Sequence, residues 1–261
     1  MLHYPEIDPV ALSIGSLSIH WYGVMYLLGF AGFWWMGTRR ARRSDTPLNA
    51  EQVGDFLFYG ALGVILGGRI GYMLFYGWDV LADNPLNILR VWDGGMAFHG
   101  GLLGVIAAMW WYAKRLGIRF FQLADFVAPM VPIGLLTGRI GNFINGELWG
   151  APAPDFPLAM VYEGVARHPS MLYEALLEGL LLLIVLMVYS RKPRPLMTVS
   201  GLFLLGYGAA RFAVEFVRLP DAHIGYLAGG WFTMGQLLTL PMLAYGAWLF
   251  VRGWQRREVI S

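Results

Sequence analysis

The sequence contains no cysteine and little charge. Of its 261 residues none is Cys, and only 14% are charged, whereas 57% are hydrophobic. The absence of cysteine excludes disulfides, zinc-thiolate sites and a covalent intermediate on a cysteine of this chain. Because soluble globular proteins carry about 25% charged residues, the low share predicts an integral membrane protein. If a thiol takes part in the chemistry, a substrate must supply it.

Several other common signals are also missing. The net charge is +2 and there is no long basic run, so nucleic acid is not an expected partner. The sequence has no P-loop, no dinucleotide fingerprint and no histidine pair at metal-ligand spacing, so we expect no cofactor and no metal. Residues 1–19 have neither the basic region nor the cleavage site of a signal peptide, and none is expected there.

The apolar residues fall into stretches long enough to cross a membrane, since a spanning helix needs about 20 mostly apolar residues. Seven stretches qualify: 18–37, 53–76, 97–113, 121–141, 170–190, 197–217 and 230–251. No linker divides them. This pattern predicts an all-α integral membrane protein of about seven transmembrane helices in a single domain, 1–261. The loops at about 77–96 and 142–169 carry tryptophans and prolines and are expected to form a small outer cap.

The positions of the basic residues predict an orientation. Most of the 19 lysines and arginines follow the first, third, fifth and seventh stretches. Because basic loops stay in the cytoplasm, the N-terminus is predicted outside, the C-terminus in the cytoplasm and the cap on the outer, periplasmic side. Three arginines lie inside or at the ends of the stretches: Arg69, Arg139 and Arg211.

The segment Gly138–Gly150 (GRIGNFINGELWG) places an arginine, two asparagines and a glutamate at or near membrane depth. Such groups are costly in hydrocarbon and by default mark a binding or reaction site. Arg139 and Arg211 carry permanently charged, planar guanidinium groups whose N–H donors match phosphate oxygens, which suits a phospholipid anion. The alternative is that each arginine pairs with a nearby carboxylate, Glu147 or Glu215, and holds helices together. Glu215 lies one helical turn after Arg211.

Further polar residues are candidates for the same site. His99, surrounded by glycines, titrates near neutral pH and would suit a general base for a thiol, or would be a structural hydrogen-bonding residue. Asn142 and Asn145 would bind glycerol hydroxyls or phosphate oxygens, or satisfy backbone where the helix ends. Tyr22 and Tyr207 would present hydroxyls to the site or anchor the protein at the membrane interface.

The start of the fifth stretch carries the sequence Arg167-His168-Pro169-Ser170. We expect Ser170 to cap this helix through its side chain and His168 to point outward.

The spacing G-R-x-G-N-F-x-N-x-E-x-x-G resembles the signature of the bacterial prolipoprotein diacylglyceryl transferases. The resemblance covers nearly the whole chain, and further matching blocks occur in the expected order: His20–Gly23, Phe98–Gly101, His168–Ser170, Tyr207–Phe212 and Glu215–Arg218. One departure is Met171, where the family usually has glutamine, which puts in doubt a role for an amide at that position.

The resemblance implies seven membrane helices, an outer head and a site open laterally to lipid. The implied reaction transfers diacylglycerol from phosphatidylglycerol to the lipobox cysteine thiol of a prolipoprotein signal peptide, at the outer side of the bacterial cytoplasmic (inner) membrane. It forms a thioether and releases glycerol phosphate.

With the residue arguments above, the resemblance implies His99, Arg139 and Arg211 as catalytic residues. The expected substrate-binding residues are Tyr22, Asn142, Asn145, Glu147, Gly150, Tyr207, Glu215 and Arg218. The alternative is a phospholipid or anion transporter, a lipid carrier that uses the same arginines without covalent chemistry. Transporters often show inverted repeats, and no such symmetry is visible here.

Overall fold

The computed structural model describes residues 2–15, 17–220 and 225–258. The chain divides into two compact parts, which are described separately. The first consists of residues 1–36 together with 125–261, and the second of residues 37–124.

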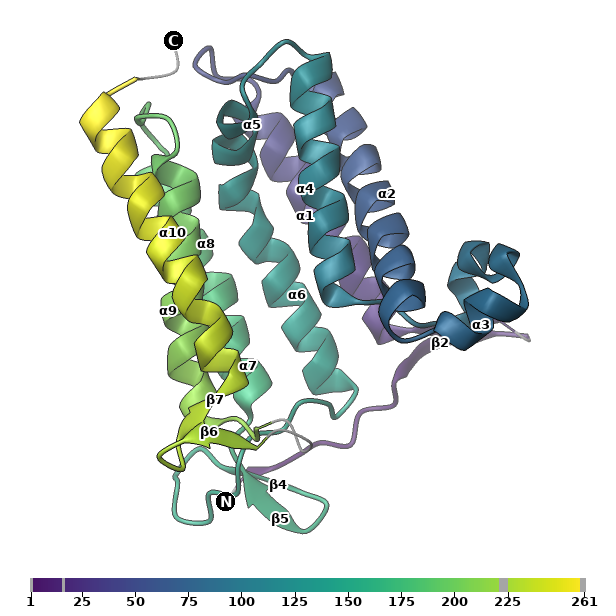
Figure 1. Ribbon diagram of the computed structural model, residues 1–261. Coiled ribbons are helices and arrows are strands. Elements are labelled where there is room, and N and C mark those ends of the chain that lie inside the picture. The colour runs from purple at the N-terminus through teal and green to yellow at the C-terminus, as the bar shows by residue number, and fades with distance from the viewer. Residues whose placement is uncertain (1, 16, 221–224, 259–261) are drawn as a thin grey trace. The chain divides into compact units, whose positions relative to one another are not determined.

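Helices account for most of the described chain (Figure 1). The α-helices are α1 (Trp21–Arg40), α2 (Ala50–Phe75), α3 (Trp78–Asp83), α4 (Phe98–Arg115), α5 (Phe120–Val127), α6 (Val131–Ile144), α7 (Ser170–Glu174), α8 (Leu182–Tyr189), α9 (Thr198–Val214) and α10 (Met234–Arg256). Short 3-10 segments are η1 (Pro85–Leu89), η2 (Val91–Asp93), η3 (Ala128–Met130) and η5 (Glu215–Val217), and η4 (Ala175–Leu181) is a π-helix.

Five helical stretches of the described chain are long and apolar enough to cross a membrane. They are Ala50–Phe75, Phe120–Ile144, Ser170–Tyr189, Thr198–Val217 and Met234–Arg256. Each coincides with a predicted stretch, which confirms a mostly helical membrane protein. Helices α1 and α4 occupy the other two predicted ranges but are not among these five.

Three of the five stretches contain a 3-10 or π segment: η3 in Phe120–Ile144, η4 in Ser170–Tyr189 and η5 at the end of Thr198–Val217. Pro129 lies in η3, between α5 and α6, and Pro132 lies in the first turn of α6. Because proline has no backbone N–H, it cannot continue the helical hydrogen-bond ladder. The π-helix η4 contains Gly179, where an added Cβ would lie 2.7 Å from Cβ of Leu136 on α6. This glycine therefore lets η4 lie against α6.

In the first part, helices α9 and α10 lie side by side (Figure 1). Gly201 on α9 permits the close approach, since a Cβ there would lie 2.7 Å from the backbone nitrogen of Phe250. The start of α9 is held by the buried Asp125, whose carboxylate accepts hydrogen bonds from the backbone N–H groups of Met197 and Ser200, at 2.7 and 2.8 Å. An acidic side chain at a helix N-terminus is favourable because it meets unpaired donors and the positive end of the helix dipole.

Short strands accompany the helices of this part. Strands β1 (Leu2–His3), β4 (Met160–Tyr162) and β5 (Val165–Arg167) form one sheet, in which β1 pairs parallel with β4, and β4 pairs antiparallel with β5. Strands β2 (Val10–Ile14) and β3 (Leu17–His20) pair antiparallel, as do β6 (Tyr226–Ala228) and β7 (Phe232–Thr233). The sequence interpretation treated 142–169 as loop, so β4 and β5 are an addition to it.

In the second part, α2 and α4 pack through glycines. A Cβ at Gly67 of α2 would lie 2.8 Å from Cα of Gly104 of α4, and a Cβ at Gly71 would lie 2.9 Å from Cα of Gly100. Small residues at this spacing let two membrane helices bring their backbones into contact. A Cβ at Gly104 would also clash with the carbonyl oxygen of Gly63.

We therefore expect Gly104→Ala to destabilise the protein, because the added methyl group must push α2 and α4 apart. The expected cost is about 1–3 kcal/mol, as for other overpacked sites, and would be measured as a lower melting temperature in detergent. Gly134→Ala is the matched control, since a Cβ there meets nothing within 4 Å. Equal melting temperatures for the two variants would show that the packing is looser than described.

Candidate functional site

Three arginines converge on the carboxylate of Glu174, at the end of α7. Glu174 is fully buried. Its Oε1 accepts hydrogen bonds from Arg211 Nη1 at 2.6 Å and from Arg218 Nη1 at 2.7 Å. Its Oε2 lies 3.0 Å from Nε of Arg139. One carboxylate thus joins α6, α9 and the residue that follows η5.

Glu215 is a second carboxylate of this network. Its Oε2 lies 2.9 Å from Arg211 Nη2 and 3.4 Å from Arg218 Nε. Its Oε1 accepts a hydrogen bond from the hydroxyl of Thr233 at 2.9 Å, and Thr233 also caps the start of α10. A Cβ at Gly235 would clash with Glu215, so this glycine makes room for the carboxylate.

Glu178, in the π-helix η4, is the third carboxylate and the least satisfied. It is fully buried, its Oε2 lies 3.7 Å from Nη2 of Arg139, and neither of its oxygens has a hydrogen-bond partner among the described residues. An incompletely paired buried charge is costly. Such a cost at membrane depth is typical of a functional site rather than of simple packing.

In this network the arginine side chains are more exposed than the glutamate side chains. The side chains of Arg139, Arg211 and Arg218 are 21%, 19% and 19% exposed, whereas those of Glu174 and Glu178 are 0% exposed. The guanidinium groups therefore form the accessible side of the network, with the carboxylates behind them. An anion reaching this surface would meet cations first.

The sequence interpretation was partly right about the partners of the arginines. The pair between Arg211 and Glu215, four residues apart, which was the alternative to phosphate binding, is present. The suggested partners Glu147 and Glu215 are wrong for Arg139, which pairs with Glu174 and Glu178. Sequence reasoning missed both of these glutamates. The signal was present, because two acidic residues four apart in the apolar stretch 170–190 are unusual in a membrane helix.

The end of α6 carries a second polar group built on Glu147. Asn142 Nδ2 donates to Glu147 Oε2 at 2.9 Å, and Asn145 Nδ2 donates to Oε1 at 3.2 Å. The turn at Gly146 has φ +67°, which favours glycine. Oδ1 of Asn145 is buried and has no hydrogen-bond partner among the described residues. It is an acceptor to which a ligand hydroxyl or N–H could donate.

Tyr4 holds this end of α6 in place, and sequence reasoning missed it. Its hydroxyl donates to the carbonyl oxygen of Ile144 at 2.8 Å. Its ring lies edge-on to the rings of Phe143, Trp149 and Tyr162, with centroids 5.5, 5.4 and 5.4 Å away. Edge-to-face aromatic pairs of this kind add stability beyond the apolar area that they bury. The N-terminal segment thereby fixes the residues on either side of Glu147.

Gly150 links the same segment to the arginine network. Its N–H donates to the carbonyl oxygen of His168 at 2.8 Å, and it forms an isolated bridge with Arg218. A Cβ at Gly150 would lie 2.9 Å from Cβ of His168 and would clash with the carbonyl oxygen of Val217. Only glycine fits between these two backbones.

The expected roles of Ser170 and His168 are wrong. Ser170 is the first residue of α7, Pro169 occupies the cap position without a side-chain cap, and the Ser170 hydroxyl donates to the carbonyl oxygen of Leu148 at 2.6 Å. His168 does not point outward, because it is half-buried and its Nδ1 lies 3.2 Å from the hydroxyl of Tyr173. Burial lowers the pKa of the His168 imidazole.

The two candidate tyrosines lie on α1 and α9. Tyr22 on α1 lies against α6, since a Cβ at Gly141 would be 3.0 Å from its ring. Gly141 directly precedes Asn142, so Tyr22 lies beside that part of α6. Tyr207 lies on α9, one turn before Arg211, and stacks on Phe203 with a centroid distance of 6.0 Å.

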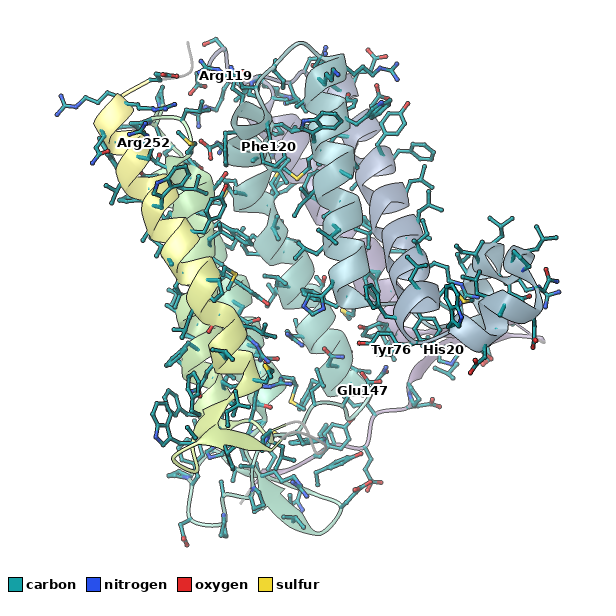
Figure 2. All side chains as sticks on the ribbon, in the orientation of Figure 1. His20, Tyr76, Arg119, Phe120, Glu147 and Arg252 are labelled. Carbon is teal, nitrogen blue, oxygen red and sulfur yellow. The ribbon has the colours of Figure 1, made fainter. Side chains whose placement is uncertain are left out.

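All predicted site residues except His99 lie in the first part of the structure. His99 belongs to the second part, where it is exposed in the first turn of α4 beside the ring of Phe98. Within the first part, Glu147 and Arg252 mark opposite ends of the helices (Figure 2).

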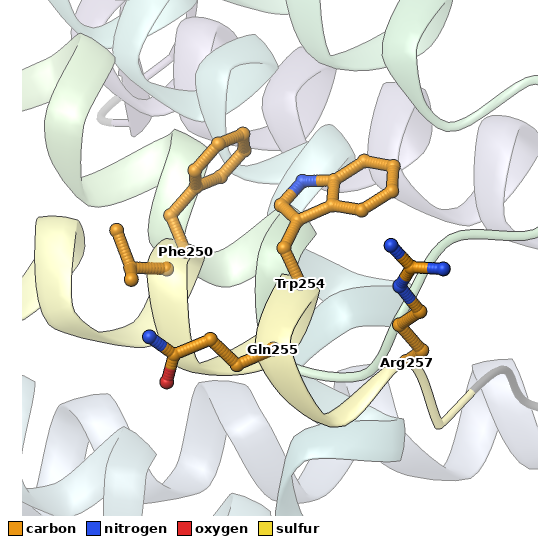
Figure 3. Close-up of a pocket in the computed structure, with 5 residues that line it drawn as sticks. Phe250, Trp254, Gln255 and Arg257 are labelled. Carbon is orange, nitrogen blue, oxygen red and sulfur yellow. The ribbon is translucent and has the colours of Figure 1, made fainter.

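A cavity of about 450 Å³ near the C-terminal end of α10 contains none of the predicted residues (Figure 3). It is lined by Phe250, Val251, Trp254, Gln255 and Arg257. Trp254 is roughly 28 Å along the helix axis from Gly235, which contacts Glu215, so this cavity is separate from the arginine network.

The fold and the site define a class: a polytopic membrane protein whose buried carboxylates hold three partly exposed arginines. Comparisons with known proteins identify the family. A family model for prolipoprotein diacylglyceryl transferase matches residues 9–252. The chain therefore belongs to the prolipoprotein diacylglyceryl transferase family.

Similar proteins from several bacteria share nearly the full length of this chain. A protein of Methylococcus capsulatus is 59% identical over 99% of this chain and 100% of its own length. One of Ectopseudomonas mendocina is 57% identical over 99% of this chain and 98% of its own length. One of Pseudomonas aeruginosa is 57% identical over 98% of this chain and 97% of its own length. All three are named phosphatidylglycerol–prolipoprotein diacylglyceryl transferase.

The network predicts that Glu174→Gln destabilises the protein, because three guanidinium groups lose the charge that holds them together. Breaking a buried ion pair from one side typically costs about 3–5 kcal/mol, so we expect a clearly lower melting temperature in detergent. The control is Asp155→Asn, at an exposed loop position. If both variants melt at the wild-type temperature, Glu174 does not hold the arginines in solution.

Proposed function

We propose that this protein transfers the diacylglyceryl group of phosphatidylglycerol to the lipobox cysteine thiol of a prolipoprotein. The single observation that carries the proposal is the surface of three partly exposed arginines backed by buried carboxylates. The names of the full-length relatives support the same reaction rather than the transport of lipid. The lack of cysteine in this chain fits direct transfer to a thiol of the substrate.

The reaction breaks the bond between the glyceryl carbon and the phosphate oxygen, and forms a bond from that carbon to the cysteine sulfur. The thiol proton passes to a base, for which His99 is the proposed residue. The phosphate leaves with glycerol and develops negative charge. Arg139 and Arg211 stabilise that charge, because preorganised cations in a water-poor site interact strongly with it.

The remaining proposed residues bind and shape the lipid. Asn142, Asn145 and Glu147 offer donors and acceptors to glycerol hydroxyls, and the unpartnered Oδ1 of Asn145 supports this role. Gly150 keeps this segment beside Arg218. Tyr22, Tyr207, Glu215 and Arg218 complete the proposed substrate-binding set.

We place the protein in the bacterial cytoplasmic membrane as one domain of seven spans. In this arrangement α1 and α4 join the five helices that are long and apolar enough on their own. The N-terminus and the site lie on the outer side, the C-terminus lies in the cytoplasm, and the loops 77–96 and 142–169 form the cap. The distribution of lysine and arginine supports this orientation.

The first experiment uses purified protein in detergent with phosphatidylglycerol and a synthetic lipobox peptide. We expect a peptide mass increase of one diacylglyceryl group and the release of glycerol phosphate. Both should disappear when the peptide cysteine is replaced by serine. Bound phosphatidylglycerol with no modified peptide would instead support the lipid carrier.

Arg139→Gln is expected to lower the transfer rate by at least about 100-fold, because the leaving phosphate loses a positioned cation. The matched control is Arg252→Gln, which removes an exposed arginine near the other end of the helices and should leave the rate unchanged (Figure 2). A wild-type rate in Arg139→Gln would rule out the proposed role of this arginine.

His99→Gln is expected to slow transfer most at neutral pH. A general base contributes typically about 100- to 10,000-fold, and the need for it falls once the peptide thiol, with a pKa near 8.5, ionises unaided. The ratio of wild-type to variant rates should therefore shrink between pH 7 and pH 9.5. A constant ratio over this range would show that His99 is not the base.

A further inference from the structure

Arg69, in the apolar helix α2, is a buried arginine that the proposed reaction does not use. Arg69 is only 3% exposed. Among the described residues no carboxylate lies within ion-pair distance of it. A buried charge without a counter-charge is costly unless other groups satisfy it. The hydrogen bonds of Arg69 therefore show which groups satisfy its buried charge.

The guanidinium of Arg69 is held by backbone carbonyl groups. Nη2 donates to Asn87 at 2.8 Å, Nε donates to Ile88 at 3.4 Å, and Nη1 donates to Gly94 and to Gly95. Arginine suits this task because its planar fork offers five donors in fixed directions. One side chain thus gathers two separate turns of the segment between α2 and α4.

The residue before Arg69 holds the next part of the same segment. The carbonyl oxygen of Gly68 accepts a hydrogen bond from the N–H of Ala97 at 2.9 Å. A Cβ at Gly68 would lie 2.8 Å from the side chain of Met96. Gly94 and Gly95 have φ of +78° and +74°, a left-handed backbone that favours glycine. Two consecutive residues of α2 thus fix the path of residues 94–97.

This path determines where α4 begins. Ala97 is the N-cap of α4 and makes no side-chain cap, so the first turn depends on its backbone contacts. His99 lies in that first turn. We propose that Arg69 is a positioning residue, which holds segment 87–97 and thereby places the ring of His99 for proton transfer. This inference rests on the proposed function, in which His99 is the base.

Hydrogen exchange tests the hold on the segment without any need for activity. Arg69→Gln keeps a polar side chain but loses the charge and most of the donors. We expect the amides of residues 87–97, that of Ala97 among them, to exchange at least tenfold faster than in the wild-type protein. The control is Arg90→Gln, which removes an exposed arginine from the same segment. Unchanged exchange in Arg69→Gln would overturn the proposal.

Kinetics distinguish positioning of His99 from a general loss of folded protein. Arg69→Gln should lower kcat at pH 7 by about 10- to 100-fold, should leave KM for phosphatidylglycerol unchanged, and should approach the wild-type rate at pH 9.5, where the thiol ionises unaided. A smaller amount of folded enzyme would instead give the same loss at every pH. A pH-independent loss therefore contradicts the proposal.

The double variant Arg69→Gln/His99→Gln provides the sharpest comparison. If Arg69 acts through His99, the double variant should be no slower than His99→Gln alone, because residues that act as a unit have non-additive effects. Multiplied losses would show that Arg69 acts independently of His99 and would overturn the proposal. If the wild-type protein transfers no lipid, the proposed function fails, and hydrogen exchange still decides whether Arg69 holds the segment.

Discussion

The site depends on the buried carboxylate of Glu174. Three guanidinium groups lie within 3.0 Å of its two oxygens, and they come from α6, α9 and the residue after η5. Three like charges this close repel one another strongly in a medium of low dielectric constant. Their common contact with Glu174, together with the contacts to Glu215 and Glu178, offsets that repulsion and fixes their directions. The arrangement of these helices and the chemistry of the site therefore have the same cause.

Bringing so many charges together requires backbone that approaches unusually closely. The π-helix η4 contains Glu178 and directly follows Glu174, and Gly179 within it allows contact with α6. Single-turn π-helices are rare and occur frequently at functional sites. Gly235 makes room for the carboxylate of Glu215, and Gly150 fits between the backbones of His168 and Val217. At these positions glycine leaves space that a methyl group would fill.

The sequence predicts those features that are local. The pair between Arg211 and Glu215 follows from a spacing of one helical turn, and the five helices long and apolar enough to cross a membrane follow from continuous apolar stretches. The contacts of Glu174 lie beyond such reasoning, because its hydrogen-bond partners are 37 and 44 residues away in the chain. Strands of three residues, such as β4, are too short to show an alternating pattern. Ser170 lies at a helix start, but its hydroxyl donates a hydrogen bond to the carbonyl oxygen of Leu148 instead of capping the helix.

Arg139 and Arg211 differ from Arg69 in how far they are buried and in the groups that they contact. Arg139 and Arg211 are balanced by buried side-chain carboxylates and remain about one-fifth exposed, so an incoming anion could contact them. Arg69 is buried and held by carbonyl groups of the backbone. An anion could reach it only by displacing the segment that it holds together. The first kind of arginine is suited to binding a phosphate, whereas the second is suited to fixing the chain before His99, the proposed base.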